Sequence, residues 1–78
     1  MGTYIANNTT EVTRTIEAIV VLQDTVFTSI KVAGTDVKST YIAAPGTAVK
    51  AGAIITPINN LQFSGVQLAS GSVALVLG

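Results

Sequence analysis

The hydrophobic and polar positions along the chain favour short strands over helices. Val, Ile and Thr are frequent, and glycines and prolines recur between them at short intervals, which is typical of strands joined by turns. The segment 9–22 comes nearest to a helix, because Thr10 could cap one. Nine of its fourteen residues are β-branched, however, and branching at Cβ costs rotamer freedom in a helix. We therefore expect one long strand there, with the even positions from Val12 to Leu22 forming its apolar face.

The rest of the chain reads as six further short strands separated by turn residues. We expect the strands at residues 25–33, 37–43, 48–49, 53–56, 61–69 and 72–77, with turns at 34–36, 45–46, 50–52, 59–60 and 70–71. About seven strands at this spacing predict an all-β fold, a small sandwich or barrel that is jelly-roll-like, as one domain over residues 9–78. Residues 1–8 are expected to be an N-terminal arm or tail.

The chain also contains an internal pseudo-repeat. Residues 27–37 read FTSIKVAGTDV and residues 63–73 read FSGVQLASGSV, so aromatic, small and apolar residues recur at matching places. One interpretation is that two hairpins of a sandwich simply look alike. The other is a duplicated fold whose halves face each other across one core. In both cases Phe27 and Phe63 are predicted to be core anchors.

Composition adds a requirement for association. A 78-residue chain buries only about 60% of the surface that its unfolded form exposes, so small domains usually need disulfides, a metal or oligomerisation. The sequence has no Cys and no His, which excludes disulfides and the usual transition-metal ligands. Only 10% of its residues are charged, against about 25% in an average soluble domain. We therefore expect self-association through surface aliphatic residues.

Charge and hydropathy argue against several other classes of protein. The net charge is zero and the four basic residues are scattered, so no nucleic-acid partner is expected. The longest wholly apolar run covers residues 18–22, much shorter than the roughly 20 residues that a membrane-spanning helix needs. The first eight residues lack the pattern of a secretory signal, so synthesis in the cytoplasm is expected.

Candidate chemistry is sparse, and no enzyme activity, catalytic residue, metal or cofactor is expected. Without His, the usual base that activates a Ser or Thr nucleophile is missing. Glu11 and Glu17 share a strand parity, but such a pair is more typical of a solvated face than of a hydrolytic site. Asp24 and Asp36 are too isolated in the sequence to form a calcium loop.

The C-terminal part resembles small structural proteins encoded in the virion gene clusters of tailed bacteriophages. In that family a phrase ending in Ala-Gly-x-x-Ile-x-Pro precedes one of the type Phe-x-x-Ile-x-Leu-x-Ser-Gly-x-Val. The matching residues here are Ala51, Gly52, Ile55, Pro57, Phe63, Val66, Leu68, Ser70, Gly71 and Val73. The resemblance covers roughly the last thirty residues, and its motifs build a fold rather than an active site. It implies a virion protein that decorates a capsid, as decoration or cement proteins do, or forms part of a fibre. Such a protein would be a homotrimer or another symmetric oligomer and would bind the major capsid protein or another virion protein.

Two segments carry more apolar positions than one small core can absorb. They are the predicted source of the oligomer interface, through Ile16, Ile19, Val20, Leu22, Val73, Leu75, Val76 and Leu77. Two alternatives remain open for the function. One is a carbohydrate- or receptor-binding module of a phage fibre or tail, for which Tyr4 and Tyr41 are the spare aromatic residues. The other is a self-assembling non-viral β-scaffold.

Overall fold

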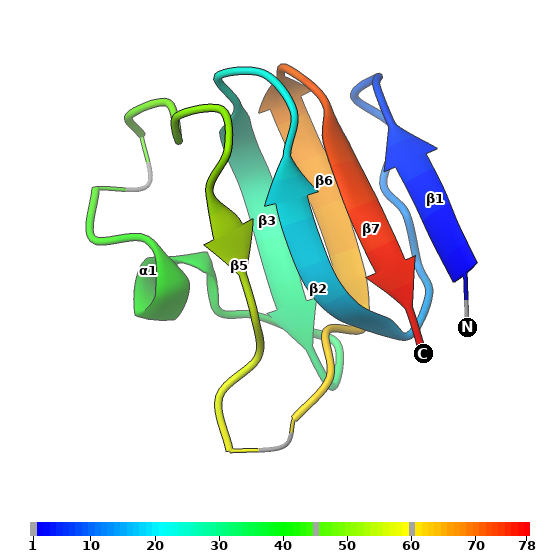
Figure 1. Ribbon diagram of the computed structural model, residues 1–78. Coiled ribbons are helices and arrows are strands. Elements are labelled where there is room, and N and C mark those ends of the chain that lie inside the picture. The colour runs from blue at the N-terminus through cyan, green and yellow to red at the C-terminus, as the bar shows by residue number, and fades with distance from the viewer. Residues whose placement is uncertain (1, 45, 60) are drawn as a thin grey trace.

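The computed structural model describes residues 2–44, 46–59 and 61–78, which form two antiparallel sheets packed face to face (Figure 1). Sheet A has the strand order β1 (Gly2–Ala6), β7 (Val73–Leu77), β2 (Ile16–Val21) and β5 (Ile54–Ile55). Sheet B has the order β4 (Thr35–Asp36), β3 (Val26–Val32) and β6 (Gly65–Ser70). The predicted small all-β sandwich is therefore confirmed.

The hydrophobic core lies between the two sheets, and both phenylalanines are part of it. Phe63 is fully buried and its ring meets that of Tyr41 edge-on, with 5.1 Å between the centroids. The buried hydrophobic residues are Ala6, Val12, Ile16, Ile19, Val21, Phe27, Ile30, Phe63, Val66, Leu68, Val73 and Leu75. The alternation expected for a sheet that is buried on one face is clearest in β7, where Val73 and Leu75 are buried and Ala74 and Val76 are only half-buried.

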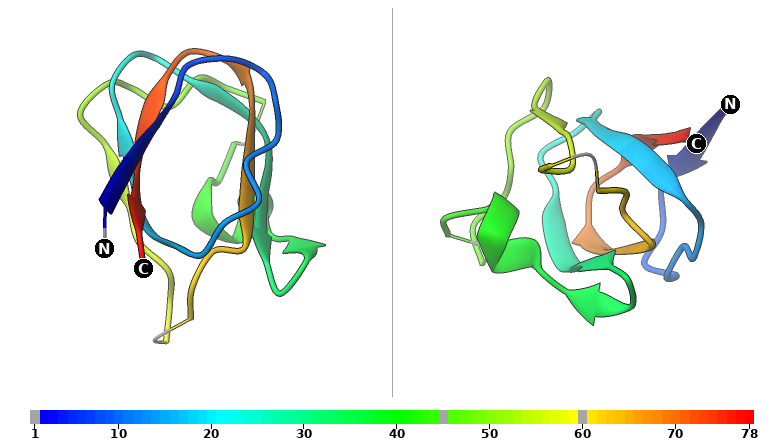
Figure 2. Two further views of the ribbon diagram at one scale, coloured as in Figure 1. Left: turned by 90° about the vertical axis from the view of Figure 1, so that its right-hand side faces the viewer. Right: turned by 90° about the horizontal axis from the view of Figure 1, so that it is seen from below.

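The sheets are joined along one side by the segment that links β1 to β2. This segment passes beside β6, where Val12 and Val66 exchange backbone hydrogen bonds of 2.8 and 2.9 Å. A second bridge joins Ile16 to Phe63. Figure 2 shows the segment descending between β1 and β6, so that the sandwich has the outline of a partly closed barrel.

The prediction of one long strand over residues 9–22 is wrong in two ways: the strand is shorter, and its even-numbered residues do not all lie on one face. Only residues 16–21 form β2, and the register against β7 shifts between Ile16 and Ala18. Such a β-bulge changes which positions face the core. Ile19 and Val21 are consequently buried, whereas Val20, which the even parity assigned to the same face as Ile16, lies on the opposite one.

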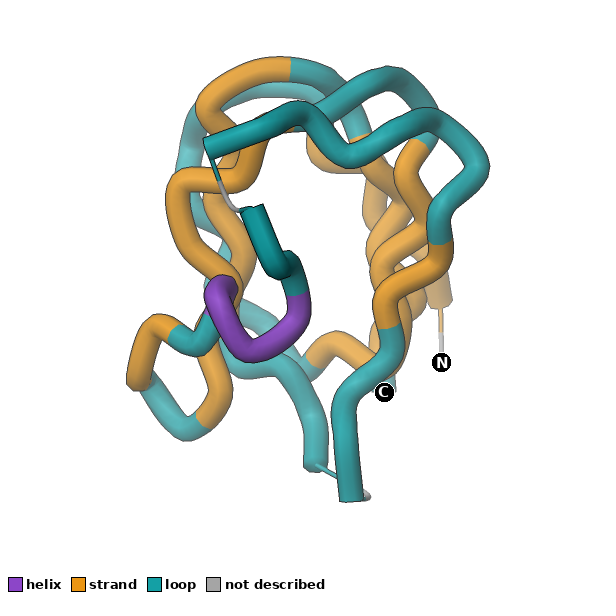
Figure 3. Tube along the Cα trace, turned by 90° about the vertical axis from the view of Figure 1, so that its left-hand side faces the viewer, coloured by secondary structure: helices purple, strands orange, loops and turns teal. Residues whose placement is uncertain are grey.

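The strand expected at residues 37–43 is also wrong, because a single helical turn, α1 (Lys38–Tyr41), replaces it. The carboxylate oxygen Oδ1 of Asp36 accepts hydrogen bonds from the backbone N–H groups of Lys38, at 3.0 Å, and Ile30, at 3.3 Å. An Asp side chain that bonds to the backbone two residues later favours a turn over an extended strand. Figure 3 shows the turn beside the sheets rather than within one.

The N-terminal segment is not a free arm over the residues that the structure describes. Gly2–Ala6 form β1 and pair in unbroken register with β7, from Gly2 opposite Leu77 to Ala6 opposite Val73. Three β-formers, Thr3, Tyr4 and Ile5, provide the local preference for a strand. Met1 lies outside the described residues, as do Pro45 of the expected turn 45–46 and Asn60 of the expected turn 59–60.

The two copies of the pseudo-repeat do not face each other across the core. They contribute β3 and β6, which are antiparallel neighbours in sheet B, with Phe27 opposite Leu68 and Ile30 opposite Val66. After the first copy the chain turns back within sheet B through β4, whereas after the second it crosses to sheet A as β7. The chain therefore leaves the two similar sequences in different directions, one within sheet B and the other toward sheet A.

Candidate interaction surface

An apolar row crosses the solvent side of sheet A. Val20 in β2 lies opposite Ile54 in β5 and Ala74 in β7, and Ala74 lies opposite Ile5 in β1. Residues opposite each other in neighbouring strands share a face of the sheet. Leu75, the next residue after Ala74, is buried in the core, so this row points away from it. Four strands therefore present four aliphatic side chains in a line.

A second row lies beside the first and has the same orientation. Ala18 in β2 pairs with Val76 in β7, and Val76 pairs with Thr3 in β1. We use the term outer face for the two rows together, which comprise Thr3, Ile5, Ala18, Val20, Ile54, Ala74 and Val76. None of these residues carries a charge.

The ends of the apolar row are the most exposed part of the outer face. Ile54 is 66% exposed and Ile5 is 49% exposed, while Val20, Ala74 and Val76 are half-buried by their neighbours. Three strands of five or six residues and the two-residue β5, spaced about 4.8 Å apart, cover roughly 300 Å² in projection. An exposed apolar patch of that size on a small protein is often a binding site.

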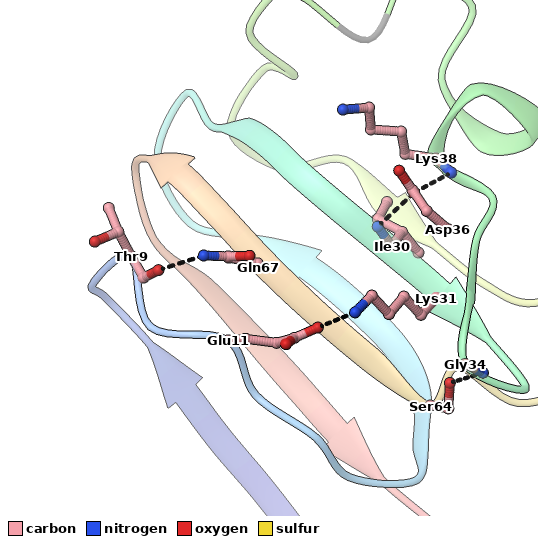
Figure 4. Close-up of polar contacts among 9 residues, drawn as sticks. All are labelled: Thr9, Glu11, Ile30, Lys31, Gly34, Asp36, Lys38, Ser64 and Gln67. Carbon is pink, nitrogen blue, oxygen red and sulfur yellow. Dashed lines mark hydrogen bonds and ion pairs between the residues drawn. The ribbon is translucent and has the colours of Figure 1, made fainter.

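The solvent side of sheet B is polar by contrast (Figure 4). Lys31 of β3 forms an ion pair of 2.6 Å with Glu11, and Gln67 of β6 donates a hydrogen bond of 3.1 Å to the backbone carbonyl of Thr9. These contacts cross from the sheet to the segment that links β1 to β2. Sheet B therefore carries polar and charged contacts on its exposed side, whereas the two rows of sheet A are uncharged and the charged residue of β2, Glu17, lies at the bulge beside them.

Charged groups lie near the rim of the outer face. At the turn between β2 and β3, Asp24 accepts a hydrogen bond from the backbone N–H of Ala51 at 3.0 Å and lies 3.3 Å from the Lys50 Nζ. The Ala51 hydrogen bond, followed by Lys50, holds the pKa of the Asp24 carboxyl below its ordinary value.

The structure separates the predicted interface residues into two groups. Four of them belong to the core of this chain and cannot contact a second chain, so the prediction is wrong for Ile16, Ile19, Val73 and Leu75. Four others reach the surface at least in part: Val20, Leu22, Val76 and Leu77. Val20 and Val76 lie on the outer face, Leu22 is 46% exposed just after β2, and Leu77 packs partly against the core.

Sequence reasoning missed Ile5 and Ile54 as members of this surface. Ile5 lies in the segment that was expected to be an arm, although three consecutive β-formers marked it as a strand. Ile54 belongs to an apolar pair in which Ile55 packs against the core and Ile54 faces solvent. The alternation of strand side chains assigns one residue of such a pair to each face.

The two tyrosines have different surroundings. Tyr41 packs against Phe63, and its hydroxyl accepts a hydrogen bond of 3.1 Å from the backbone N–H of Ile58. Tyr4 is exposed on β1, where the guanidinium of Arg14 lies 5.0 Å from its ring centroid. Tyr41 therefore has a structural role, and Tyr4 is the more accessible of the two.

The part of the chain that the structure describes contains no pocket, no cluster of metal ligands and no membrane-spanning helix. No pocket was detected, and no three Asp, Glu, Cys or His side chains lie together as metal ligands. Among the same residues, no helix has the length and apolar character needed to cross a bilayer.

Comparison of the chain with protein-family models, with curated proteins and with solved structures gave no match.

Proposed function

We propose that the chain is a non-enzymatic structural protein of a tailed-phage virion, which decorates or stabilises the capsid as a symmetric oligomer. The outer face of sheet A is the observation that supports this proposal. It leaves aliphatic side chains from all four strands at least partly in contact with water, and their exposed area contributes no hydrophobic stabilisation to the isolated subunit. Covering the face with another protein removes that apolar surface from water.

The magnitude of this effect is sufficient for assembly. An interface of about 1,000 Å² with roughly 60% apolar area gains about 15 kcal/mol at 25 cal/mol per Å². Association costs about 4–15 kcal/mol in lost freedom of motion. A single small interface thus leaves between zero and about 11 kcal/mol, and a capsid lattice adds to this by binding several subunits at once.

The test of the proposal is to place a charge at the centre of the outer face. Val20→Glu and Val76→Glu would each bury an unpaired carboxylate in the interface, at a cost of about 3–5 kcal/mol. Thr28→Glu, at an exposed position of β3 in sheet B, is the matched control. Far-ultraviolet circular dichroism of all three variants would establish that each is folded.

Two measurements follow for these variants. Light scattering after size exclusion gives the mass relative to the 8.0 kDa of one subunit. Co-sedimentation uses empty capsids assembled from the major capsid protein that is encoded beside the chain. We expect the wild type and Thr28→Glu to form oligomers and to pellet with capsids, and both Val variants to do neither. The proposal is wrong if the wild type does not pellet, or if no capsid protein is encoded nearby.

A second candidate function, glycan or receptor binding by a fibre or tail module, is favoured by one observation. Tyr4 presents an exposed ring beside a guanidinium, and aromatic rings next to polar groups suit sugar recognition. A glycan-array signal that is lost in Tyr4→Ala and kept in Thr28→Ala would support this function over capsid decoration.

A further inference from the structure

Three of the four sheet edges are protected against pairing with another strand. In sheet A, β5 is only two residues long and Pro57 follows two residues later. In sheet B, β4 is also two residues long and includes Asp36, and the free side of β6 is taken by the bridge between Val12 and Val66. Short strands, proline, charge and coverage by another segment are the usual devices that prevent edge-to-edge association.

The remaining edge, that of β1, has none of these devices. Its five residues carry no charge and no proline, and they pair with β7 without a bulge. Within the described part of the chain, no backbone hydrogen bond joins residues 2–6 to anything other than β7. In Figure 1 β1 ends the sheet, and in Figure 2 it projects from the body of the molecule. Half of its backbone groups are thus directed outward and open to a new strand.

We propose that a second copy of this chain pairs with the β1 edge, antiparallel and around a two-fold axis. Two-fold pairing places the same edge against itself, so each hydrogen bond occurs twice and no separate complementary surface is needed. The edge is neutral, so the charges of its own residues do not oppose the contact. The guanidinium of Arg14 lies over the ring of Tyr4.

The pairing also extends the surface described above. The apolar row from Ile54 to Ile5 ends at β1, and the second copy continues it across the axis as one eight-stranded sheet. The dimer rests on the proposed function and adds to it the identity of the partner at one edge of the outer face, which is a second copy of the chain. It also implies an even number of subunits, in place of the trimer that the sequence resemblance implies.

The expected strength of the pair follows from its size. A partner in a standard interface contributes about 800 Å², which is roughly a fifth of the 4244 Å² surface of this chain. Two five-residue edges bury less than that. We therefore expect a dimer that dissociates on dilution, unless the capsid holds its subunits together.

The absence of cysteine from the chain makes a direct test possible. Single substitutions Thr3→Cys, Tyr4→Cys and Ile5→Cys would scan β1. In an antiparallel pair, residues directly opposite have Cβ atoms about 4.5–5.5 Å apart, within the range that a disulfide spans. Whichever residue lies on the two-fold axis meets its own counterpart. Thr56→Cys, next to β5 at the other edge of sheet A, and Thr28→Cys in sheet B are the controls.

We expect one or two adjacent β1 positions to form disulfide-linked dimers at least about tenfold faster than both controls, because pairing raises the effective thiol concentration to the millimolar range. Equal rates at all five positions, or a wild-type mass of three subunits, would overturn the inference. A rank order that peaks at one β1 position also gives the register of the pair.

Failure of this inference and failure of the proposed function give different results. Crosslinking through β1 without any binding to capsids would support the β1 dimer and refute capsid decoration. Capsid binding without crosslinking would support the proposed function and refute the β1 dimer. In that second case, loss of capsid binding in Tyr4→Lys, which charges the β1 edge at a position outside the outer face, would show that a strand of the capsid protein occupies this edge instead.

Discussion

The turn between β6 and β7 offers the sharpest test of how the two sheets are held together. Gly71 lies in this turn with φ of +92°, and the chain there passes from sheet B to sheet A. A Cβ added to Gly71 would overlap the Thr25 Oγ1 and would lie 2.7 Å from both the Asp24 carbonyl oxygen and the Thr25 Cα. Backbone atoms of the crossing between β2 and β3 therefore occupy the space that any other side chain needs.

Three costs add in the variant Gly71→Ala. A positive φ costs a residue with a Cβ about 1–2 kcal/mol. Forcing the methyl group against packed backbone costs about 1–3 kcal/mol more. The fully buried Thr25 hydroxyl, which donates a 2.7 Å hydrogen bond to the Gln23 carbonyl, would also be displaced. We expect a total loss of about 2–5 kcal/mol, from a stability of about 4–12 kcal/mol for a domain of this length.

Gly52→Ala separates the steric cost from the conformational one. Gly52 has nearly the same φ, +93°, and nothing lies within 4 Å of the Cβ that the substitution would add. Urea unfolding followed by far-ultraviolet circular dichroism suits a chain without Trp. We expect Gly71→Ala to lose at least about 1–3 kcal/mol more than Gly52→Ala, which is the overpacking contribution. Equal losses would refute the claim that the two crossings pack against each other.

Three further predictions concern single side chains, each measured by chemical unfolding. Ala33 has φ of +52° in the two-residue turn between β3 and β4, so Ala33→Asn should stabilise the fold by about 0.5–1 kcal/mol, since Asn tolerates this conformation. The same change at Ala69, its repeat equivalent within β6, should not stabilise the fold. The buried Ser29 hydroxyl has no hydrogen-bond partner among the described residues, so Ser29→Ala should gain about 1 kcal/mol, and a loss would reveal a partner. The folded state lowers the pKa of the Asp24 carboxyl. The ionised carboxyl therefore stabilises the fold fully at pH values above its ordinary pKa, near 4, and this stabilisation is lost as the pH falls through the lowered pKa. Asp24→Asn should therefore flatten the acid limb of the stability curve, and an unchanged limb would contradict this reasoning.

The strand content of the fold could be predicted from the sequence, but the faces of the strands could not. β-branched residues and turn signals located the segments that became β3, β6 and β7 to within a few residues. The bulge at Ile16 to Ala18 reverses the parity of β2, and no local signal marks it, because Glu17 and Ala18 fit either face of a strand. The prediction therefore placed both Ile19 and Val20 in the interface, whereas Ile19 is buried in the core and only Val20 reaches the outer face.

Other differences have causes that lie outside the local sequence. The carboxylate of Asp36 bonds to the backbone of β3, and this contact across the hairpin accompanies a helical turn where alternation predicted a strand. β1 depends on β7 for its only backbone partners in the described structure, so a pattern read along residues 2–6 alone cannot identify its sheet. The candidate surface needed this pairing as well, because its rows exist only when the register of four strands is known.

The position of β7 in sheet A determines the order in which the chain can fold. β7 lies between β1 and β2, yet it follows both of them in the sequence, and Gly2 pairs with Leu77. During synthesis the first strand emerges long before the strand that completes its hydrogen bonds. Sheet A consequently forms only after the whole domain has left the ribosome, through contacts of very high sequence separation. Proteins dominated by such contacts fold in milliseconds to seconds rather than in microseconds. In that interval the unprotected β1 strand is available to other copies, so assembly and misassembly compete at the same edge.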